Sequence, residues 1–578
     1  MENIEIARVL RDLADLFEIK GSNPFRIRAY RNAAEVVEAN EEPMREMVEA
    51  GADLTGLPAI GKDMARHIEE LVRVGKSSTL EELAKEVPLT LIELTHLPGL
   101  GAKRAKKLWE QLDVTTIDEL ERAATSGGIE SLAGFGKKTQ ATIVASIERY
   151  RRHRERTKID DADRYVVPIV ERLSEHPAVQ RIHIVGSLRR RCERVGDIDL
   201  LAVTAEPEAV VERFARLPNL RRIEAHSHAA ASGTISSGLR VDLNVVLPEA
   251  SGAALVYLTG SRQHNARICD IAESRDVGLS EMFCNELSGD MDTAARVAGP
   301  TEEEIYEILG LGWIAPELRE DRGEVEAASL DKLPELVTMS DIRGDLQMHS
   351  TWSDGKETIE GMLEACAERG YDYFAITDHS QALAMTGGLD AARLRQQWVE
   401  IDVVAERHPE VKILRGMEVD ILADGRLDLE DEMLAALDLV LASVHSRFDL
   451  PAATQTDRIT KALRHPEVNI LAHPTGRQIN RRDPMRFDLD TVLECAAEHN
   501  VAVELNAHPN RLDLSDVQLM RAKELGLKIV ISTDAHSAGD LDLMKYGVEQ
   551  ARRAWLGKND VINTLEYHEL LAALAIEE

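Results

Sequence analysis

The segment 183–203 restricts the fold of this chain more than any other, because it joins a glycine turn to two closely spaced aspartates. We expect one strand at 182–185 and a second strand that carries Asp197 and Asp199. Since side chains alternate along a strand, both aspartates project from one face, about 6–7 Å apart along the chain. Like charges held that close repel, and a shared divalent cation is the usual remedy. The segment therefore predicts a strand that carries a metal site.

The turn between these two strands is suited to holding an anionic phosphate. Gly186 lets the backbone approach closely, and Ser187 offers a hydroxyl and an N–H group where we expect a helix to start. Arg189 and Arg190 add positive charge beside the turn. The segment thus combines a cradle for a phosphate with a site for a cation.

Two metal ions need more oxygen ligands than two side chains supply, so a third carboxylate is expected on a neighbouring strand. Asp242 lies in the strongly strand-like run 239–246 and provides it. Acidic pairs are common on solvated strand ends, but the glycine turn and the third aspartate favour a catalytic role. A carboxylate-bound metal that faces a phosphate cradle is the equipment for transferring a nucleotidyl group.

The order of these motifs resembles one known family. The spacing Gly-Ser, nine residues, Asp-x-Asp, then Asp242, then YLTGS at 257–261, is similar to the palm and nucleotide pocket of the family X DNA polymerases, the DNA polymerase beta group. By this resemblance the catalytic residues are Asp197, Asp199 and Asp242, which hold two Mg²⁺ ions. The nucleotide-binding residues implied are Gly186, Ser187, Arg190, Gly196, Tyr257, Gly260 and Asn265. Leu258 stands where the family usually has an aromatic residue, which leaves sugar discrimination open.

Composition permits several packed domains but is unusual for a protein that binds DNA. The 578 residues suggest roughly three to five domains. Five cysteines without a C-x-x-C pair favour a reducing cytosol, and neither a signal peptide nor a membrane span is evident, so we expect a cytoplasmic protein without membrane contact. The net charge of −33 requires local basic surfaces if the chain is to bind phosphates.

Three similar turns in the first 160 residues supply such surfaces. The segments 57–62 (LPAIGK), 97–104 (LPGLGAKR) and 132–138 (LAGFGKK) each form a turn that ends in glycine and leads into a lysine-bearing helix. They resemble the helix–hairpin–helix motif, which binds a backbone phosphate through amide groups. The DNA-binding residues predicted from these turns are Gly61, Gly99, Gly101, Lys103, Gly134, Gly136 and Lys137. Ala59 replaces the usual glycine in the first motif, and we expect this motif to bind a backbone phosphate more weakly.

The family resemblance implies one further activity that a residue of this chain argues against. In animal relatives the N-terminal domain removes a sugar phosphate with a lysine that forms a Schiff base. That position falls on His67, and histidine cannot form the imine. We therefore expect no lyase activity through this site.

The last 240 residues hold a disproportionate share of the histidines, and these usually end an apolar run. Seven short strands, alternating with helices at 359–369, 389–406, 490–499 and 514–525, indicate a parallel β/α barrel. Catalytic groups of such barrels lie at the carboxyl ends of the strands. The candidate metal ligands at these ends are His349, Asp354, His379, Glu418, His445, His473, Asp534 and His536. Imidazole and carboxylate ligands together favour Zn²⁺, Mn²⁺ or Fe²⁺ over Mg²⁺ or Ca²⁺.

This order of ligands resembles the PHP (polymerase and histidinol phosphatase) phosphoesterase domain, which binds three metals. The resemblance implies that His349, Glu418 and Asp534 hold one ion. Glu418 would bridge to a second ion held by His445 and His473. The third ion would be held by Asp354, His379 and His536. Gln347 stands where the family usually has a histidine, so we expect the first ion to be held more weakly or by a softer set of ligands.

Together these resemblances cover the whole chain and imply a bacterial or archaeal family X DNA polymerase with a C-terminal PHP domain. The expected fold is multidomain: helical domains with helix–hairpin–helix motifs, an α+β nucleotidyltransferase palm with a thumb, and a distorted seven-stranded parallel barrel. The boundaries expected are an N-terminal DNA-binding domain at 1–88, a fingers-like domain at 89–158, the palm at 159–250, the thumb at 251–326, a linker at 327–341 and the PHP domain at 342–578.

The leading hypothesis is a monomer that fills short gaps in DNA during base excision or break repair, with dNTPs and gapped or 3′-recessed DNA as substrates. The PHP metals, Zn²⁺ or Mn²⁺ or both, would supply 3′–5′ exonuclease or 3′-end phosphoesterase activity. One alternative is a repair nuclease whose palm only binds DNA. Another is a phosphatase of small phosphate esters, unrelated to DNA.

Overall fold

The computed structural model describes residues 3–40, 43–74, 76–95, 97, 100–129, 132, 135–136, 139–140, 142–144, 146–147, 156–275, 301–383 and 386–574. The chain forms two compact units, the first made mainly of residues 1–157 and the second mainly of residues 158–578. Within the described residues no helix has both the length and the apolar character needed to cross a membrane.

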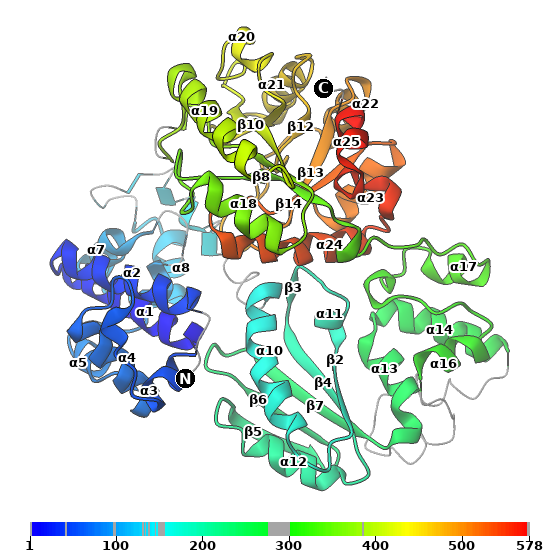
Figure 1. Ribbon diagram of the computed structural model, residues 1–578. Coiled ribbons are helices and arrows are strands. Elements are labelled where there is room, and N and C mark those ends of the chain that lie inside the picture. Colours follow the sequence, from blue (N-terminus) through cyan, green and yellow to red (C-terminus); the bar gives the residue numbers. More distant parts are fainter. Residues whose placement is uncertain are drawn as a thin grey trace. The chain divides into compact units, whose positions relative to one another are not determined.

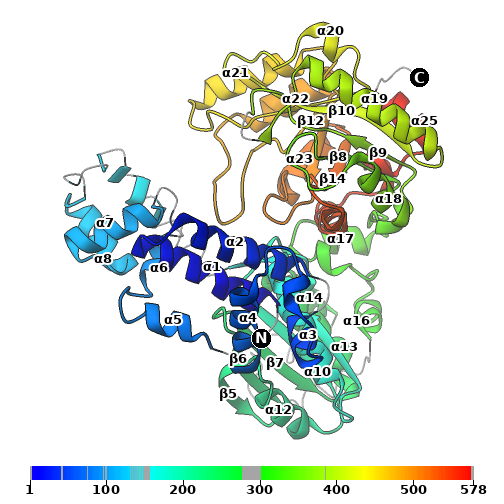
Figure 2. The ribbon, with the colours of Figure 1, turned by 60° about the vertical axis from the view of Figure 1, so that its left-hand side comes forward.

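The first unit is helical. Its helices are α1 (Asn3–Lys20), α2 (Pro24–Ala39), α3 (Met44–Glu49), α4 (Lys62–Val74), α5 (Ser78–Leu83), α6 (Leu91–Thr95), α7 (Ala102–Leu112) and α8 (Ile117–Thr125). The long helices α1 and α2 lie side by side (Figure 2). Leu10 of α1, Ile68 of α4 and Leu108 of α7 belong to one continuous cluster of buried residues. The segments 1–88 and 89–158, which the sequence separates, therefore share a core.

The palm is a mixed sheet flanked by helices (Figure 1). Its elements are β1 (Thr157–Lys158), α10 (Ile159–Ser174), β2 (Arg181–Val185), α11 (Gly186–Arg189), β3 (Arg194–Val195), β4 (Asp197–Val203), α12 (Pro207–Ala215), β5 (Arg221–Ser227), β6 (Ala230–Thr234) and β7 (Arg240–Val246). The strand order in the large sheet is β2-β4-β7-β6-β5. Strand β4 pairs antiparallel with β2 and parallel with β7.

The thumb consists of α13 (Ser251–Thr259), α14 (Arg262–Ser274), α16 (Glu302–Ile308) and α17 (Glu324–Ser329). Val325 and Ala328 of α17 are buried in the same apolar cluster as α13, α14 and α16. Leu333 and Leu336 also pack against this cluster. The thumb core thus extends into the segment 327–341, which the sequence assigns to a linker.

The last domain is a parallel barrel surrounded by helices (Figure 1). Its strands are β8 (Gly344–Met348), β9 (Tyr373–Ile376), β10 (Lys412–Asp420), β11 (Leu439–Ser443), β12 (Ile470–Leu471), β13 (Ala502–Asn506) and β14 (Ile529–Ser532). Its helices are α18 (Ile359–Glu368), α19 (Ala391–Arg407), α20 (Asp431–Leu434), α21 (Ala452–Leu463), α22 (Leu489–Glu498), α23 (Asp516–Glu524), α24 (Met544–Arg553) and α25 (Tyr567–Ala573).

The seven strands follow one another in chain order, and the first and last also meet. A parallel bridge joins Met348 to Ala535, and the backbone N–H of Asp534 donates to the carbonyl of Gln347 at 3.1 Å. This contact nearly closes the barrel and confirms the seven-stranded architecture that the sequence predicts. Because all the strands are parallel, their carboxyl ends lie at one rim of the barrel.

Candidate active sites

The palm brings the three predicted aspartates together. In the parallel pairing of β4 with β7, Asp199 lies opposite Asp242, and Asp197 precedes Asp199 by two residues on the same face. Carboxylate oxygens of the three residues lie within 4.8 Å of one another. The neighbouring Ile198 and Leu200 point to the other face and are fully buried. The alternation of the strand therefore fixes the cluster.

The electrostatics of this cluster fit a cation site. Burial, with the added charges of Asp197 and Asp242, raises the pKa of Asp199 to about 7. Burial also raises the pKa of Asp242, and this is opposed by Arg240, whose Nε donates to Asp242 Oδ1 at 2.8 Å. A carboxylate cluster in which Asp199 and Asp242 have raised pKa values is a donor set that Mg²⁺ would stabilise.

The turn after β2 lies against the aspartates. Gly186 has a φ of +65°, and a Cβ atom at this position would overlap the carboxylate of Asp199. Only glycine meets both requirements. Ser187 follows in α11, and Gly196 is exposed in the short connection between β3 and β4. The turn is thus held directly beside the carboxylate cluster.

The start of the thumb encloses the side chain of Arg190. Arg190 Nη1 donates to the carbonyl of Thr259 at 2.6 Å, and Nε donates to Glu320 Oε1 at 3.0 Å. Gly260 has a φ of +68°, and a Cβ atom there would lie 3.2 Å from Arg190 Nη1. Asn265 Nδ2 donates to the carbonyl of Tyr257 at 2.7 Å. The predicted nucleotide-binding residues of palm and thumb therefore lie close together.

The side chain of Arg189 was expected beside the phosphate-binding turn, but it pairs with the thumb instead. Its guanidinium forms a two-bond ion pair with Glu302 of α16, at 2.8 and 2.6 Å, and also donates to Thr259 Oγ1 at 2.6 Å. Arg319 donates to the same Glu302 carboxylate at 2.7 Å. Burial alone would raise the pKa of Glu302, but the two arginines outweigh it and lower the pKa to about 2. Arg189 thus connects the palm with the thumb, and the phosphate cradle has Arg190 as its neighbouring cation.

The second cluster lies at the carboxyl rim of the barrel. His349 follows β8, His379 follows β9, Glu418 is in β10, His445 follows β11, His473 follows β12, and Asp534 and His536 follow β14. Asp354 comes from the loop after His349. Every predicted ligand is therefore near the strand end where the sequence places it.

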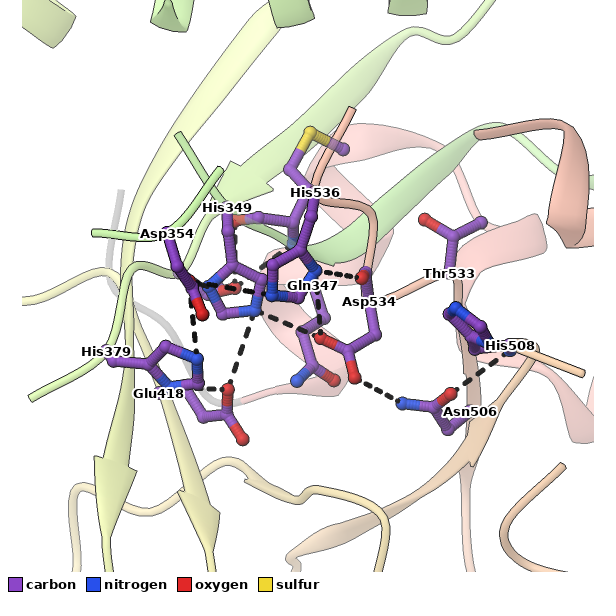
Figure 3. A network of polar contacts seen from close by, with 12 residues as sticks. Gln347, His349, Asp354, His379, Glu418, Asn506, His508, Thr533, Asp534 and His536 are labelled. Carbon is purple, nitrogen blue, oxygen red and sulfur yellow. Dashed lines mark hydrogen bonds and ion pairs between the residues drawn. The ribbon is translucent and has the colours of Figure 1, made fainter. Parts of the chain in front are cut away.

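Glu418 is at the centre of this cluster (Figure 3). Its Oε2 atom lies 3.5 Å from His349 Nε2 and 3.2 Å from His379 Nδ1. His349 Nε2 in turn lies 3.0 Å from Asp534 Oδ1. Ligand atoms of His349, Glu418 and Asp534 fall within 4.8 Å of one another, which is compatible with a shared ion.

The other oxygen of Glu418 faces two further histidines. Its Oε1 atom lies 2.9 Å from His473 Nε2 and 3.3 Å from His445 Nε2. Burial would raise the pKa of Glu418, but the surrounding histidines lower it well below its ordinary value. One carboxylate thus offers an oxygen to each of two neighbouring groups of ligands, as a bridging ligand must.

A third group opens toward the solvent. Asp354 Oδ1 lies 3.6 Å from His379 Nε2 and 3.5 Å from His536 Nε2. The rings of His349 and His536 stack with centroids 4.3 Å apart. Ligand atoms of these four residues lie within 4.8 Å of one another. The rim therefore offers three overlapping sets of donors.

Buried atoms without partners fit the presence of cations. Among the described residues, Glu418 Oε1 and Oε2, His349 Nδ1, and His473 Nδ1 and Nε2 are buried and make no hydrogen bond of good geometry, although Glu418 Oε1 and His473 Nε2 lie only 2.9 Å apart. Leaving such groups unpaired is costly, and a cation bound between them removes that cost. Burial lowers the pKa of His379 to about 4, which keeps its ring neutral and able to bind a metal at neutral pH.

Gln347 is part of the same cluster (Figure 3). It is fully buried in β8, and neither its amide oxygen nor its amide nitrogen has a hydrogen-bond partner among the described residues. An amide oxygen is a poorer ligand than an imidazole for Zn²⁺ or Mn²⁺. The replacement expected to weaken the first ion thus faces the cluster directly.

Two residues beside the cluster were not singled out from the sequence. Asn506 Nδ2 donates to Asp534 Oδ2 at 3.1 Å, and Arg511 Nε lies 3.3 Å from the same oxygen. Asn506 is the last residue of β13, a strand for which no ligand was predicted. Its position at a strand end was the available signal. Arg511 follows in the loop beyond β13, and no periodic pattern marks it.

The structure describes some of the predicted helix–hairpin–helix residues but not all of them. Gly61 precedes α4, Gly101 is the N-cap of α7, and Lys103 is exposed on α7. Gly136 is described as well, whereas Gly99, Gly134 and Lys137 lie outside the described residues. Ala59 has a φ of +55°, a conformation that favours glycine, so the first motif keeps the backbone shape at a cost in strain.

His67 is half-buried in α4 and packs against an aromatic residue. Its ring centroid lies 5.7 Å from that of Tyr30, and its Nδ1 lies 3.4 Å from Thr79 Oγ1. Burial lowers its pKa. An imidazole in this position still has no amine with which to form an imine.

Models of known families match most of this architecture. A helix-hairpin-helix domain matches residues 1–77, and a SAM-like helix-hairpin-helix tandem matches residues 51–112 and 91–149. A DNA polymerase beta thumb matches residues 254–320, and a PHP domain matches residues 345–508.

Curated relatives fall into two groups. The DNA polymerase/3′-5′ exonuclease PolX of Bacillus subtilis (strain 168) is 41% identical over 576 residues, 99% of each chain. A probable phosphatase of Thermoanaerobacter sp. (strain X514) is 29% identical over 219 residues, 36% of this chain and 84% of the relative. A probable phosphatase of Shewanella sp. (strain ANA-3) is 32% identical over 193 residues, 32% of this chain and 72% of the relative.

Proposed function

The chain belongs to the family X DNA polymerases that carry a C-terminal PHP domain, and from this premise we propose that it fills short gaps in DNA and trims 3′ ends. The observation that carries the polymerase activity is the register of β4 and β7, which gathers Asp197, Asp199 and Asp242 beside the Gly186 turn. The observation that carries the trimming activity is the cluster around Glu418 at the rim of the barrel.

At the palm, three aspartates and a turn have separate tasks. Asp197, Asp199 and Asp242 would hold two Mg²⁺ ions, which supply Lewis-acid activation of the α-phosphate and neutralise charge on the leaving pyrophosphate. The Gly186 turn and Ser187 bind the triphosphate through N–H and hydroxyl groups.

Asp242 is the group that we assign to accept the proton of the primer 3′-hydroxyl. Its Oδ1 is hydrogen-bonded to Arg240, so Oδ2 is the accepting atom.

At the barrel rim, the ligands would hold up to three ions of Zn²⁺ or Mn²⁺ in the sets described above. Such ions supply a water of lowered pKa and stabilise the charge of a phosphate under attack. Glu418 keeps the neighbouring ligand sets at a fixed separation, because one carboxylate serves both. A 3′ end of DNA is the substrate that a polymerase on the same chain would present.

The helical unit would hold the duplex. Backbone N–H groups after Gly61, Gly99, Gly101, Gly134 and Gly136, with Lys103 and Lys137, would bind backbone phosphates without reading sequence. A cytoplasmic monomer that acts in base excision or break repair is the form in which we expect the protein to work.

Primer extension on gapped duplex DNA tests this proposal. The Asp197→Ala/Asp199→Ala protein should lose nucleotide addition and keep 3′ trimming, and His473→Ala should do the reverse. Asp331→Asn, which changes an exposed aspartate of the segment after the thumb, is the matched control and should keep both activities. Undiminished extension by the double variant would overturn the polymerase assignment and leave a nuclease whose palm only holds DNA.

The relatives named probable phosphatases favour a second candidate, the hydrolysis of small phosphate esters at the PHP cluster. Comparing the hydrolysis of histidinol phosphate with that of a 3′-recessed duplex decides between the two substrates. Faster turnover of the small ester would assign the barrel to that reaction.

A further inference from the structure

Helix α24 of the PHP domain contacts the nucleotide cradle of the palm. Arg553 Nη1 donates to the carbonyl of Arg190 at 2.7 Å, and Gln550 Nε2 donates to the carbonyl of Arg191 at 2.7 Å. The palm residues 158–215, which include α11, belong to the same compact unit as the PHP domain. Both side chains therefore bind the backbone directly after α11, the short helix that starts at the phosphate-binding turn.

These two carbonyls lie where a helix leaves its acceptors unpaired. Arg191 has a φ of +56°, and the chain reverses there, with Arg191 N–H donating to the carbonyl of Leu188 and Cys192 N–H donating to that of Ser187, both at 3.1 Å. The carbonyls of Arg190 and Arg191 are then beyond the last turn of the helix. The PHP domain supplies the donors that this end of the cradle requires.

A second path from Arg553 reaches the side chain of Arg190. Arg553 Nη1 donates to Glu320 Oε1 at 2.9 Å, and Arg190 Nε donates to the same oxygen at 3.0 Å. Arg190 Nη1 is bonded in turn to the carbonyl of Thr259 at 2.6 Å. The Arg190 guanidinium is thus oriented by one carboxylate and one carbonyl, and that carboxylate is shared with the PHP domain.

Sharing Glu320 between two arginines leaves positive charge at the cradle. The side chain of Arg553 is 6% exposed, and its Nη2 also donates to Asp516 at 2.9 Å. With Arg553 present, Glu320 does not neutralise Arg190 alone. Without Arg553, Glu320 pairs with Arg190 alone and neutralises its positive charge more completely. The attraction of Arg190 for an anionic triphosphate is then weakened.

We propose that Arg553 and Gln550 are positioning residues of the polymerase site, so that the PHP domain is a structural part of the nucleotide cradle as well as a nuclease. This inference rests on the proposed function, because it concerns the binding of dNTP. It makes the affinity for nucleotide depend on two side chains that touch neither nucleotide nor metal.

The test measures gap filling by the full-length protein as a function of dNTP concentration. Arg553→Gln should raise the KM for dNTP about tenfold or more, with a smaller change in kcat, because binding of the triphosphate is what is lost. Arg553→Lys keeps the charge and should restore part of the affinity. Gln550→Ala removes one neutral donor and should raise KM by a factor of about three.

Arg552→Gln is the matched control. Arg552 is the neighbour of Arg553 on α24 and also crosses to the thumb, where its Nε donates to Glu317 at 2.7 Å, but it does not touch the cradle. It should leave the KM for dNTP within about twofold of the wild-type value. Trimming of single-stranded 3′ ends, measured in parallel, should stay near wild type in every variant and serves to show that the barrel is folded.

The outcomes separate this inference from the proposed function. A wild-type protein that adds no nucleotide contradicts the proposed function itself. A wild-type protein that extends primers, with an unchanged KM in Arg553→Gln and Gln550→Ala, overturns only the role of α24. If Arg553→Gln does not fold, an unchanged KM for dNTP in Gln550→Ala is sufficient to overturn the role of α24. Equal increases of KM in Arg552→Gln and Arg553→Gln would also overturn it, because they would show that any loss of contact between the domains has this effect.

Discussion

Gly186 lies so close to Asp199 that a single methyl group on its α-carbon would overlap the Asp199 carboxylate. The turn that we propose to hold a phosphate and the strand that we propose to hold a metal are therefore in direct contact. Any change in one displaces the other, which explains why the sequence places a glycine at this point.

Replacing Gly186 with alanine should abolish nucleotide addition, because the new methyl group displaces Asp199 and the φ of +65° disfavours a side chain. We expect a loss of at least about a hundredfold in kcat/KM for gap filling. Gly238→Ala is the control, since Gly238 has a φ of +87° but open space around its α-carbon. Equal losses in the two variants would attribute the effect to backbone strain alone.

Binding of Mg²⁺ to the palm should release a proton near neutral pH. Burial and two neighbouring carboxylates raise the pKa of Asp199 to about 7, so the group is mostly protonated at pH 6 and ionised at pH 8. Mg²⁺ must displace that proton, and its affinity should fall about tenfold for each pH unit below 7. Calorimetric titration in buffers of different ionisation enthalpy measures the proton count.

Asp197→Asn provides the check on that titration, because it removes one of the charges that raise the pKa of Asp199. In this variant the release should shift to lower pH. An affinity for Mg²⁺ that is the same at pH 6 and pH 8 in the wild-type protein would contradict the prediction.

Glu302 should stabilise the thumb above about pH 4.5 and lose this effect in acid. Its pKa lies at about 2 in the folded chain, below the ordinary value of 4.5, because Arg319 and Arg189 outweigh its burial. A depressed pKa stabilises the fold above the unfolded value, and the contribution disappears as the pH falls toward the folded value. Hydrogen exchange of thumb peptides between pH 7 and pH 3 should follow this loss.

Glu302→Gln should destabilise the thumb by about 3–5 kcal/mol at pH 7, since it leaves the fully buried Arg319 without its ionic partner. Glu303→Gln, at the exposed neighbouring position, should have little effect. Thumb protection that is insensitive to Glu302→Gln would show that the ion pair does not stabilise this domain.

Gln347→His should strengthen the first metal centre of the barrel. The glutamine is buried against the ligands with both amide atoms unpaired, and an imidazole there would add a neutral nitrogen donor. We expect more Zn²⁺ or Mn²⁺ to be retained after dialysis, measured by elemental analysis. His499→Ala, at the end of α22, is the control and should retain the wild-type amount; a histidine at 347 that retains no more metal would exclude that position as a ligand.

Lys103→Glu should weaken binding to gapped DNA and reduce the salt dependence by about one phosphate contact. Lys103 is exposed at the start of α7, one residue after the N-terminal Ala102 of that helix. Lys85→Glu makes the same charge change at another exposed position and serves as control. Equal losses in both variants, measured by fluorescence anisotropy at several salt concentrations, would assign the effect to net charge.

The features that repeat along the chain could be predicted from the sequence. Alternation in β4 and the apolar runs of the barrel determine which face or which end carries each side chain, so the aspartates and the histidines were found by position alone. The fate of Arg189 could not be predicted, because its partner Glu302 is 113 residues away and belongs to a helix whose acidic start reads as solvated surface. The contact of α24 with the end of α11 could not be predicted either. Gln550 and Arg553 have the pattern of ordinary polar residues on a helix that covers a barrel.

The closing of the barrel between Met348 and Ala535 has a consequence for the order in which the protein becomes active during synthesis. His349 belongs to the first strand end and Asp534 to the last, so a nascent chain exposes the whole polymerase sequence before the nuclease pocket can form. A premature stop between the thumb and β14 would yield a product that retains the helices proposed to hold DNA and lacks the complete ligand cluster of the barrel. The chain thus cannot degrade a primer until nearly all of it has left the ribosome.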